Sequence, residues 1–217
     1  YEMSASLVGS EMCIRDRIVN GLTEGAKKHA KHNVKVLQKA VDKEMKVLTT
    51  SSTCVLTMRD EYKDLLKIDN SGVRDSLLLA TKFIYSLIDS GKVKLAFKKD
   101  YKARIAYHTP CHLEKLGWGI FSTSLLKMIP GVEFTMLDSN CCGISGTYGF
   151  KKENYEVSQA IGKPLFDQIG RVAPDFVACD CETCKWQIEM STGFTVKNPI
   201  SVLAEALDLE ATAKLNR

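Results

Sequence analysis

The sequence predicts an α/β fold built around a mainly parallel sheet, and three observations support this prediction. Short β-prone runs alternate with amphipathic stretches of helical length along the 217 residues, which is typical of strand–helix–strand units. Hydrophobic residues make up 45% of the chain, enough for a packed core, and no low-complexity tract interrupts the pattern. Most of the cysteines follow directly after predicted strands. Collagen, coiled coils and wholesale disorder are excluded.

Charge and hydropathy exclude two further classes. The 30 basic and 26 acidic residues are interspersed and give a net charge of +4, so we expect no nucleic-acid partner. The longest apolar stretch, from Leu77 to Ile88, contains Lys82 and is shorter than the ~20 residues that a membrane-spanning helix needs. We therefore expect no transmembrane helix.

The N-terminal elements follow from helical periodicity. Apolar residues recur on one face between Thr23 and Val41 and predict a helix there. A β-prone run over residues 46–50 and a helical stretch from about 51 to 66 come next. The spacing then predicts one long amphipathic helix over residues 73–90, ended by Gly91.

The C-terminal part alternates strand, loop and helix. We predict strands over residues 93–97, 103–107, 132–137 and 175–178, and helices over residues 119–128, 153–170, from 181 onward and 199–209. Loops follow the strands, among them residues 140–143 and the glycine-rich stretch to Gly149. Because open parallel sheets gather their ligands at the carboxyl ends of the strands, these loops are where a site is expected.

A weak internal repeat predicts two pseudo-repeated modules. Aligning Cys54 with Cys184 superposes two copies of helix, strand, Thr-Cys and helix. The first copy is incomplete, because Ser51 stands where the second copy has Cys181. We expect a truncated first module over residues 18–100 and a complete second module over residues 101–217.

The first seventeen residues are interpreted as a sequencing-adapter artefact. They lack helical or strand periodicity, and Glu11-Met12-Cys13-Ile14-Arg15-Asp16-Arg17 matches the translation of a transposase adapter. Such scars are excluded from fold reasoning. We expect the native chain to continue upstream of Ile18.

Five cysteines form the strongest signal in the sequence. Cys111 is separated by 29 residues from the pair Cys141-Cys142, and 38 further residues lead to Cys181-x-x-Cys184. Disulfides fit poorly, because no secretory signal is present and the chain is large enough to have its own core. A structural zinc ion takes only four ligands, and a thioredoxin-like pair at Cys181 and Cys184 leaves three cysteines unexplained. An iron-sulfur cluster fits five thiolates better.

Neighbouring residues are expected to support this site. Asp180 is a candidate N-cap for a helix that begins with the Cys181 motif, where N–H groups and the helix dipole stabilise thiolates. Lys185 would add positive charge, and Gly143 would let the backbone approach sulfur. A phosphate-binding glycine loop is the weaker alternative, because the spacing fits no known pattern.

Histidines and the remaining cysteines have weaker assignments. Pro110 lies between His108 and His112 and breaks the helical face that would aim both rings at one ion, so hydrogen bonding around the cluster is favoured over ligation. Cys179 is interpreted as a buried spare thiol. Cys54 is a candidate ligand of a second site or the relic of a first one.

The cysteine motifs resemble a known family. Thr109-Pro110-Cys111-His112, Cys141-Cys142-Gly143 and Cys181-x-x-Cys184 resemble one complete CCG cysteine-rich domain, found in the B subunits of heterodisulfide reductases and in iron-sulfur subunits of respiratory dehydrogenases. The longer strings 108–115, 142–154 and 180–189 resemble the C subunits of anaerobic glycerol-3-phosphate dehydrogenases, and the likeness extends from near Ile18 to the C-terminus.

The resemblance implies a fold, a cofactor and partners. Cys111, Cys141, Cys142, Cys181 and Cys184 would hold a noncubane 4Fe-4S cluster, and cubane clusters are expected only in an N-terminal ferredoxin-like region that is absent here. The chain would relay electrons from flavin-containing dehydrogenase subunits to the membrane quinone pool in anaerobic respiration. It would be cytoplasmic, peripheral at the inner face of the cell membrane, and not itself catalytic.

Two other functions stay open at this point. A catalytic subunit like that of heterodisulfide reductase would cleave a disulfide at the cluster, and a structural zinc module would only tether partners. Whether the first module binds any cluster is a separate question, because it retains only Cys54.

Overall fold

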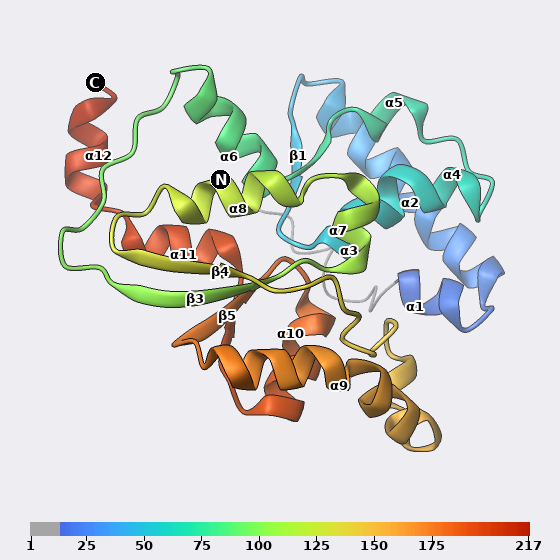
Figure 1. Ribbon diagram of the computed structural model, residues 1–217. Coiled ribbons are helices and arrows are strands. Elements are labelled where there is room, and N and C mark those ends of the chain that lie inside the picture. Colours follow the sequence, from blue (N-terminus) through green and yellow to red (C-terminus); the bar gives the residue numbers. More distant parts are fainter. Residues whose placement is uncertain (1–13) are drawn as a thin grey trace. The chain divides into compact units, whose positions relative to one another are not determined.

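The computed structural model describes residues 14–217, and the chain forms two compact units (Figure 1). Within the described residues, the first unit comprises 14–49 together with 53–78, and the second comprises 50–52 and 79–217. The interpretation of residues 1–17 as adapter-derived lies, for residues 1–13, outside the described part of the chain. Residues 14–17 belong to helix α1.

The first unit is mainly helical. Its elements in order are α1 (Ile14–Val19), α2 (Thr23–Val41), β1 (Val47–Thr49), α3 (Ser52–Leu56), a π-helical turn (Thr57–Glu61), α4 (Tyr62–Asp64), α5 (Ser71–Arg74) and β2 (Leu77–Leu79). The end residues Ser52 and Leu79 are assigned to the second unit. Ala26 and Ala30 on α2 are buried in a core that includes Tyr62 and Leu66. The predicted helix from Thr23 to Val41 and the short strand after it are confirmed.

The single helix predicted over residues 73–90 is wrong. α5 ends at Arg74, β2 pairs with β1, and only then does α6 (Ala80–Asp89) begin. Leu77 and Leu79 are fully buried, so the three consecutive leucines serve as a buried strand, which periodicity cannot distinguish from a helical segment. Gly91 ends α6 in the left-handed conformation, φ +70°, as expected.

The second unit contains a four-stranded parallel sheet. Its strands are β3 (Ala103–His108), β4 (Val132–Met136), β5 (Phe176–Cys179) and β6 (Val196–Lys197), in the order β4-β3-β5-β6. Three of them were predicted within one or two residues, whereas the two-residue β6 gave no signal. The strand expected over residues 93–97 is reduced to one antiparallel bridge, between Phe97 and Leu207.

Helices cover both faces of this sheet (Figure 1). α8 and α11 lie on one face, and α9 and α10 lie on the other. The helices and helical turns are α7 (Cys111–Leu116), α8 (Gly119–Lys127), η3 (Tyr148–Phe150), η4 (Lys152–Asn154), α9 (Tyr155–Val172), α10 (Glu182–Thr192), α11 (Pro199–Ala206) and α12 (Leu209–Leu215). The predicted α/β class with parallel strands is confirmed.

The strand order places a topological switch between β3 and β5. The chain passes from β3 to β4 on one side and then crosses to β5 on the other side. His108 and Cys179 end these neighbouring strands and pair in the parallel register. The carboxyl ends of β3 and β5 therefore form the crevice in which α/β sheets usually bind ligands.

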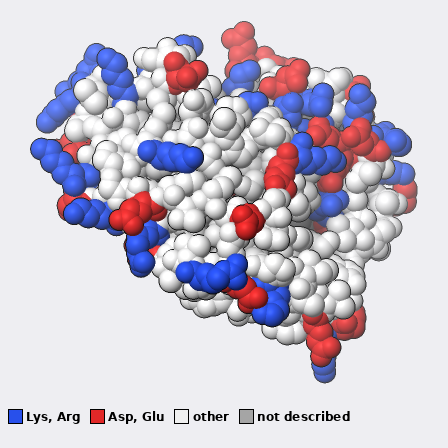
Figure 2. Space-filling view, in the orientation of Figure 1, with Lys and Arg blue, Asp and Glu red and all other residues white. Residues whose placement is uncertain are grey.

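Two further features of the structure are the distribution of its charged side chains and the length and apolar character of its helices. Basic and acidic side chains are both distributed over the face in view in Figure 2. Among residues 14–217, no helix combines the length and the apolar character needed to cross a membrane.

Candidate metal centre

Each predicted cysteine lies just beyond the carboxyl end of a strand. Cys111 is the first residue of α7, directly after β3 and Pro110. Cys141 and Cys142 lie in the loop after β4, Cys181 is the N-cap residue of α10 after β5, and Cys184 lies in the first turn of that helix. The local reason is the same in each case, because a parallel strand must be followed by a loop that leads into a crossover helix.

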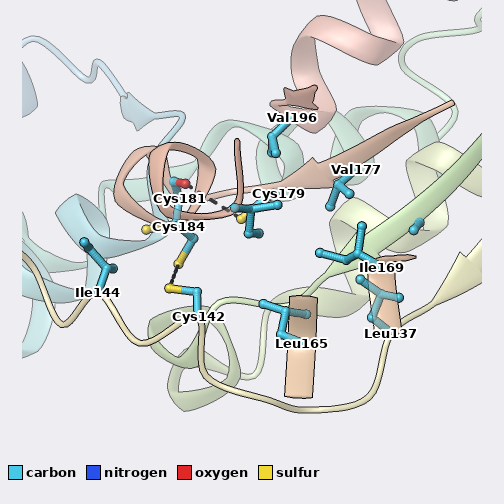
Figure 3. Close-up of a cluster of buried hydrophobic side chains, with 12 residues drawn as sticks. Leu137, Cys142, Ile144, Leu165, Ile169, Val177, Cys179, Cys181, Cys184 and Val196 are labelled. Carbon is cyan, nitrogen blue, oxygen red and sulfur yellow. Dashed lines mark hydrogen bonds between the residues drawn. The ribbon is translucent and has the colours of Figure 1, made fainter. Parts of the chain in front are cut away.

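Two sulfur atoms and one imidazole lie close together in the buried part of the site. The sulfurs of Cys142 and Cys184 lie 3.3 Å apart (Figure 3). A ring nitrogen of His108 and these two sulfurs all lie within 4.8 Å of one another. The three side chains are buried, at 3%, 5% and 1% exposure for Cys142, Cys184 and His108.

The other thiols adjoin this group. Burial raises the pKa of the Cys111 thiol, and the proximity of Cys141 and Cys181 raises it further. Cys184 interacts with Cys142, Cys179 and Cys181, and Cys142 also interacts with Cys141. The five predicted thiols therefore form one connected group. Cys111 and Cys141 are exposed, whereas the other three are buried, so the group of thiols reaches the surface at these two residues.

Closely spaced thiolates in this group of cysteines require a cation to offset their mutual repulsion. The hydrogen bond with Cys142 and burial raise the pKa of Cys141, and none of the cysteines in residues 14–217 forms a disulfide. Several negative sulfurs at such distances repel one another in a buried setting. Metal binding would offset this cost and release protons, so the donor set fits a thiophilic metal group.

The backbone of the Cys141-Cys142-Gly143 loop donates a hydrogen bond to a cysteine sulfur and is itself held by a buried side chain. The N–H of Gly143 donates to the Cys141 sulfur at 3.3 Å. Gly143 has φ +86°, and a Cβ there would collide with the carbonyl oxygen of Ser158. Ser158 Oγ donates to the Gly143 carbonyl at 2.9 Å and accepts from the Gln187 amide at 2.9 Å.

Asp180 does not cap α10, so the predicted N-cap is wrong. The N-cap residue is Cys181, with no side-chain capping bond. The Asp180 carboxylate points into the core instead, where it accepts from Tyr107 Oη at 2.6 Å and from Ser122 Oγ at 2.9 Å. Burial raises the pKa of Asp180 to about 6. A buried carboxylate needs such hydrogen-bond donors, and Tyr107 and Ser122 supply them.

The remaining site candidates are dispersed. Lys185 lies 4.0 Å from the Glu189 carboxylate along α10. His112 lies on α7, whereas His108 ends β3, so the two rings come from different elements. Cys54 is exposed on α3, most of which belongs to the other unit. Cys179, interpreted as a buried or spare thiol, is buried and interacts with Cys184, and burial raises its pKa to about 11.

Aliphatic side chains pack in the same buried cluster as the buried thiols. Leu165 and Ile169 from α9 pack with Val177 from β5 in the same buried cluster as Cys142 and Cys184 (Figure 3). These apolar side chains exclude water and so strengthen electrostatic interactions among the thiols.

Comparisons with known proteins agree with this geometry. Residues 105–189 match the cysteine-rich domain family. The chain is 52% identical over 191 residues to the C subunit of anaerobic glycerol-3-phosphate dehydrogenase of Escherichia coli K12, and the match covers 88% of this chain and 48% of that relative. The chain thus spans about half the length of this relative.

Two archaeal proteins are more distant relatives. The B subunit of fumarate reductase (CoM/CoB) of Methanothermobacter marburgensis is 28% identical, over 67% of this chain and 28% of that protein. An uncharacterized iron-sulfur protein of Methanocaldococcus jannaschii is 29% identical, over 67% of this chain and 27% of that protein. Residues 105–189 therefore match the cysteine-rich domain family, and the chain is similar to the Escherichia coli C subunit over 191 residues.

Proposed function

We propose that the second unit holds an iron-sulfur cluster, of the noncubane 4Fe-4S type, on five cysteines. The ligands would be Cys111, Cys141, Cys142, Cys181 and Cys184. The observation that carries this proposal is the connected group of five thiols at the switch point of the sheet. Two relatives with an iron-sulfur or reductase name support the same cofactor.

The residues of the chain would hold and tune such a cluster. One-electron redox chemistry is what a cluster of this kind supplies when bound. Burial of Cys142, Cys181 and Cys184 keeps water from one side, and the Gly143 N–H partly neutralises the Cys141 thiolate. The exposed Cys111 and Cys141 mark the edge through which electrons would enter or leave.

The function that fits best is electron transfer within a dehydrogenase complex. The 52% identity to a relative named for anaerobic glycerol-3-phosphate dehydrogenase supports this assignment. The chain would relay electrons from flavin-containing subunits to the membrane quinone pool, as a cytoplasmic protein bound peripherally at the inner membrane face. It would not bind the dehydrogenase substrate itself.

Metal analysis tests the proposal. The full chain is reconstituted anaerobically with iron and sulfide, and iron, sulfide and zinc are counted and an EPR spectrum is recorded. We expect four irons per second-unit site, and loss of this iron in Cys142→Ser and Cys184→Ser. The control Cys54→Ser, changed in the other unit, should retain it. Stoichiometric zinc without sulfide would overturn the proposal and favour a structural zinc module.

A catalytic thiol-disulfide function is the second candidate. It is favoured by the two exposed thiols, Cys111 and Cys141, which a disulfide substrate could reach. Turnover of disulfides by the complete complex, compared with turnover of quinone analogues, separates the two functions. Only a reductase should act on disulfides.

A further inference from the structure

His108 is a buried polar residue without a hydrogen-bond partner. It is 1% exposed, and neither ring nitrogen has a partner among the described residues. Leaving a buried donor or acceptor unpaired costs about 1–3 kcal/mol, and most native structures avoid it. The side chain therefore requires an explanation that the folded chain alone does not give.

Two cysteine sulfurs lie close to one of the unpaired ring nitrogens. One nitrogen lies within 4.8 Å of the sulfurs of both Cys142 and Cys184. The strand register fixes this position, because His108 ends β3 directly beside Cys179 at the end of β5. The position of the imidazole is therefore set by the sheet and not by a loop.

The protonation state of the His108 ring determines how many N–H groups it can donate. The imidazole carries one N–H when neutral and two when protonated, so it can donate a hydrogen bond in either state. Thiolates and sulfide ions are acceptors only. Of the two tautomers, the one that directs N–H toward the sulfurs is therefore the favourable one once a cluster is bound.

We propose that His108 is a positioning residue that donates an N–H hydrogen bond to the cluster sulfurs at Cys142 and Cys184. The inference rests on the proposed cluster. Donation is favoured over coordination because five thiolates already exceed four irons in number, so no iron requires a nitrogen ligand. A hydrogen bond to sulfur stabilises the more negative, reduced state and raises the reduction potential.

Three variants of the full chain test this role. His108→Leu removes the donor, whereas His108→Asn and His108→Gln each keep an amide N–H at a different reach. We expect His108→Leu to retain iron and sulfide but to show a more negative midpoint potential in an EPR-monitored titration. At least one amide variant should recover part of the shift, and His32→Leu, an exposed histidine on α2, should match the wild type.

Spectroscopy on the wild type keeps the test independent of variant folding. With histidine labelled by 15N, ENDOR spectra in H2O and D2O should show an exchangeable proton and a weak nitrogen coupling. A strong nitrogen coupling, typical of an imidazole bound to iron, would overturn the proposal in favour of ligation. Absence of both couplings, or an unchanged potential in a fully loaded His108→Leu protein, would also overturn it.

The outcomes separate this inference from the proposed function. If the wild type takes up zinc and no sulfide, the cluster itself is refuted. If the wild type forms the cluster but shows no His108 proton, only the role of His108 is refuted.

Discussion

Gly143 is the residue at which backbone conformation and site geometry depend most directly on each other. Its φ of +86° is costly for any residue with a Cβ, and a Cβ would also meet the Ser158 carbonyl. Relief of that collision would move the N–H that donates to Cys141. The glycine is therefore required by both space and backbone angle.

We predict that Gly143→Ala destabilises the protein by about 2 kcal/mol or more, the sum of left-handed strain and a backbone collision. Urea unfolding of the anaerobic metal-free chain measures the change. Gly170→Ala is the matched control, because Gly170 lies in α9 with nothing near its missing Cβ. That substitution should be neutral or stabilise by up to about 1 kcal/mol; equal effects at both positions would contradict the argument.

Also at the scale of residues, the sequence predicts which side chains carry the chemistry of the site better than it predicts where an individual side chain points. The five cysteines were predicted to converge from spacing alone, since strand ends meet at one sheet edge. Asp180 was assigned to a helix cap, because the sequence does not reveal that Tyr107 and Ser122 lie close enough to donate to it. The burial of His108 likewise depends on the register of β3 with β5, which no local pattern encodes.

At the scale of elements, a chain of hydrogen bonds joins two helices to the cysteine loop. Gln187 of α10 donates to Ser158 of α9, and Ser158 donates to the carbonyl of Gly143. Both side chains are fully buried. Ser158 therefore fixes the loop that carries Cys141 and Cys142 to the two helices on one face of the sheet.

We predict that Ser158→Ala costs about 1–3 kcal/mol, because it leaves the Gln187 amide and the Gly143 carbonyl buried without this partner. Urea unfolding measures the loss, and iron retention after reconstitution should fall as well. Ser86→Ala, an exposed serine on α6 whose hydroxyl bonds only within its own helix, should change stability by less than about 0.5 kcal/mol. Full stability of Ser158→Ala would show that the loop is held in another way.

An ion pair joins β3 and β5 at the end of the sheet opposite to the site. The Asp175 carboxylate accepts from the Arg104 backbone N–H and from its guanidinium, both at 2.8 Å. The backbone bond is the larger cause, and the two together lower the pKa of Asp175 below its ordinary value. The pair aligns the first residues of the two strands that end at His108 and Cys179.

This shift predicts a pH dependence with a definite sign. Because the folded-state pKa is lowered, Asp175 contributes stability above its unfolded pKa of about 4, and this contribution is lost as the pH falls through the lower folded-state value. Asp175→Asn should therefore reduce the loss of unfolding free energy on acidification from pH 5 to 3. Arg104→Gln should reduce it less, since the backbone donor remains; identical slopes in all three proteins would contradict the prediction.

The elements that sequence analysis missed are short. β2 and β6 have three and two residues, too few for an alternation to appear, and α7 begins directly after Pro110, where a loop was expected. Long helices such as α2 and α9 were predicted closely because periodicity accumulates over many residues. Short elements are fixed by their tertiary partners, as β2 is by its pairing with β1.

At the scale of the whole molecule, the site draws on segments far apart in sequence but on one unit only. The residues of the site lie between His108 and Gln187, all within the second unit. Cluster binding would join the start of α7, the loop after β4 and the start of α10 through bonds that the metal-free chain lacks. Binding to the folded state alone also stabilises that state by mass action.

We therefore predict a discontinuous pattern of protection in hydrogen–deuterium exchange. Comparing the reconstituted full chain with its anaerobic metal-free form, amides in α7, in residues 141–149 and in the first turns of α10 should exchange more slowly together. Amides of α2, in the first unit, should exchange at the same rate in both forms, which provides an internal control. Cys184→Ser, treated identically, should abolish all three changes at once, because the shared cluster is the link that binding adds among these segments. Protection of a single segment would instead indicate a smaller metal site, and equal protection of α2 would indicate a general effect of reconstitution on folding.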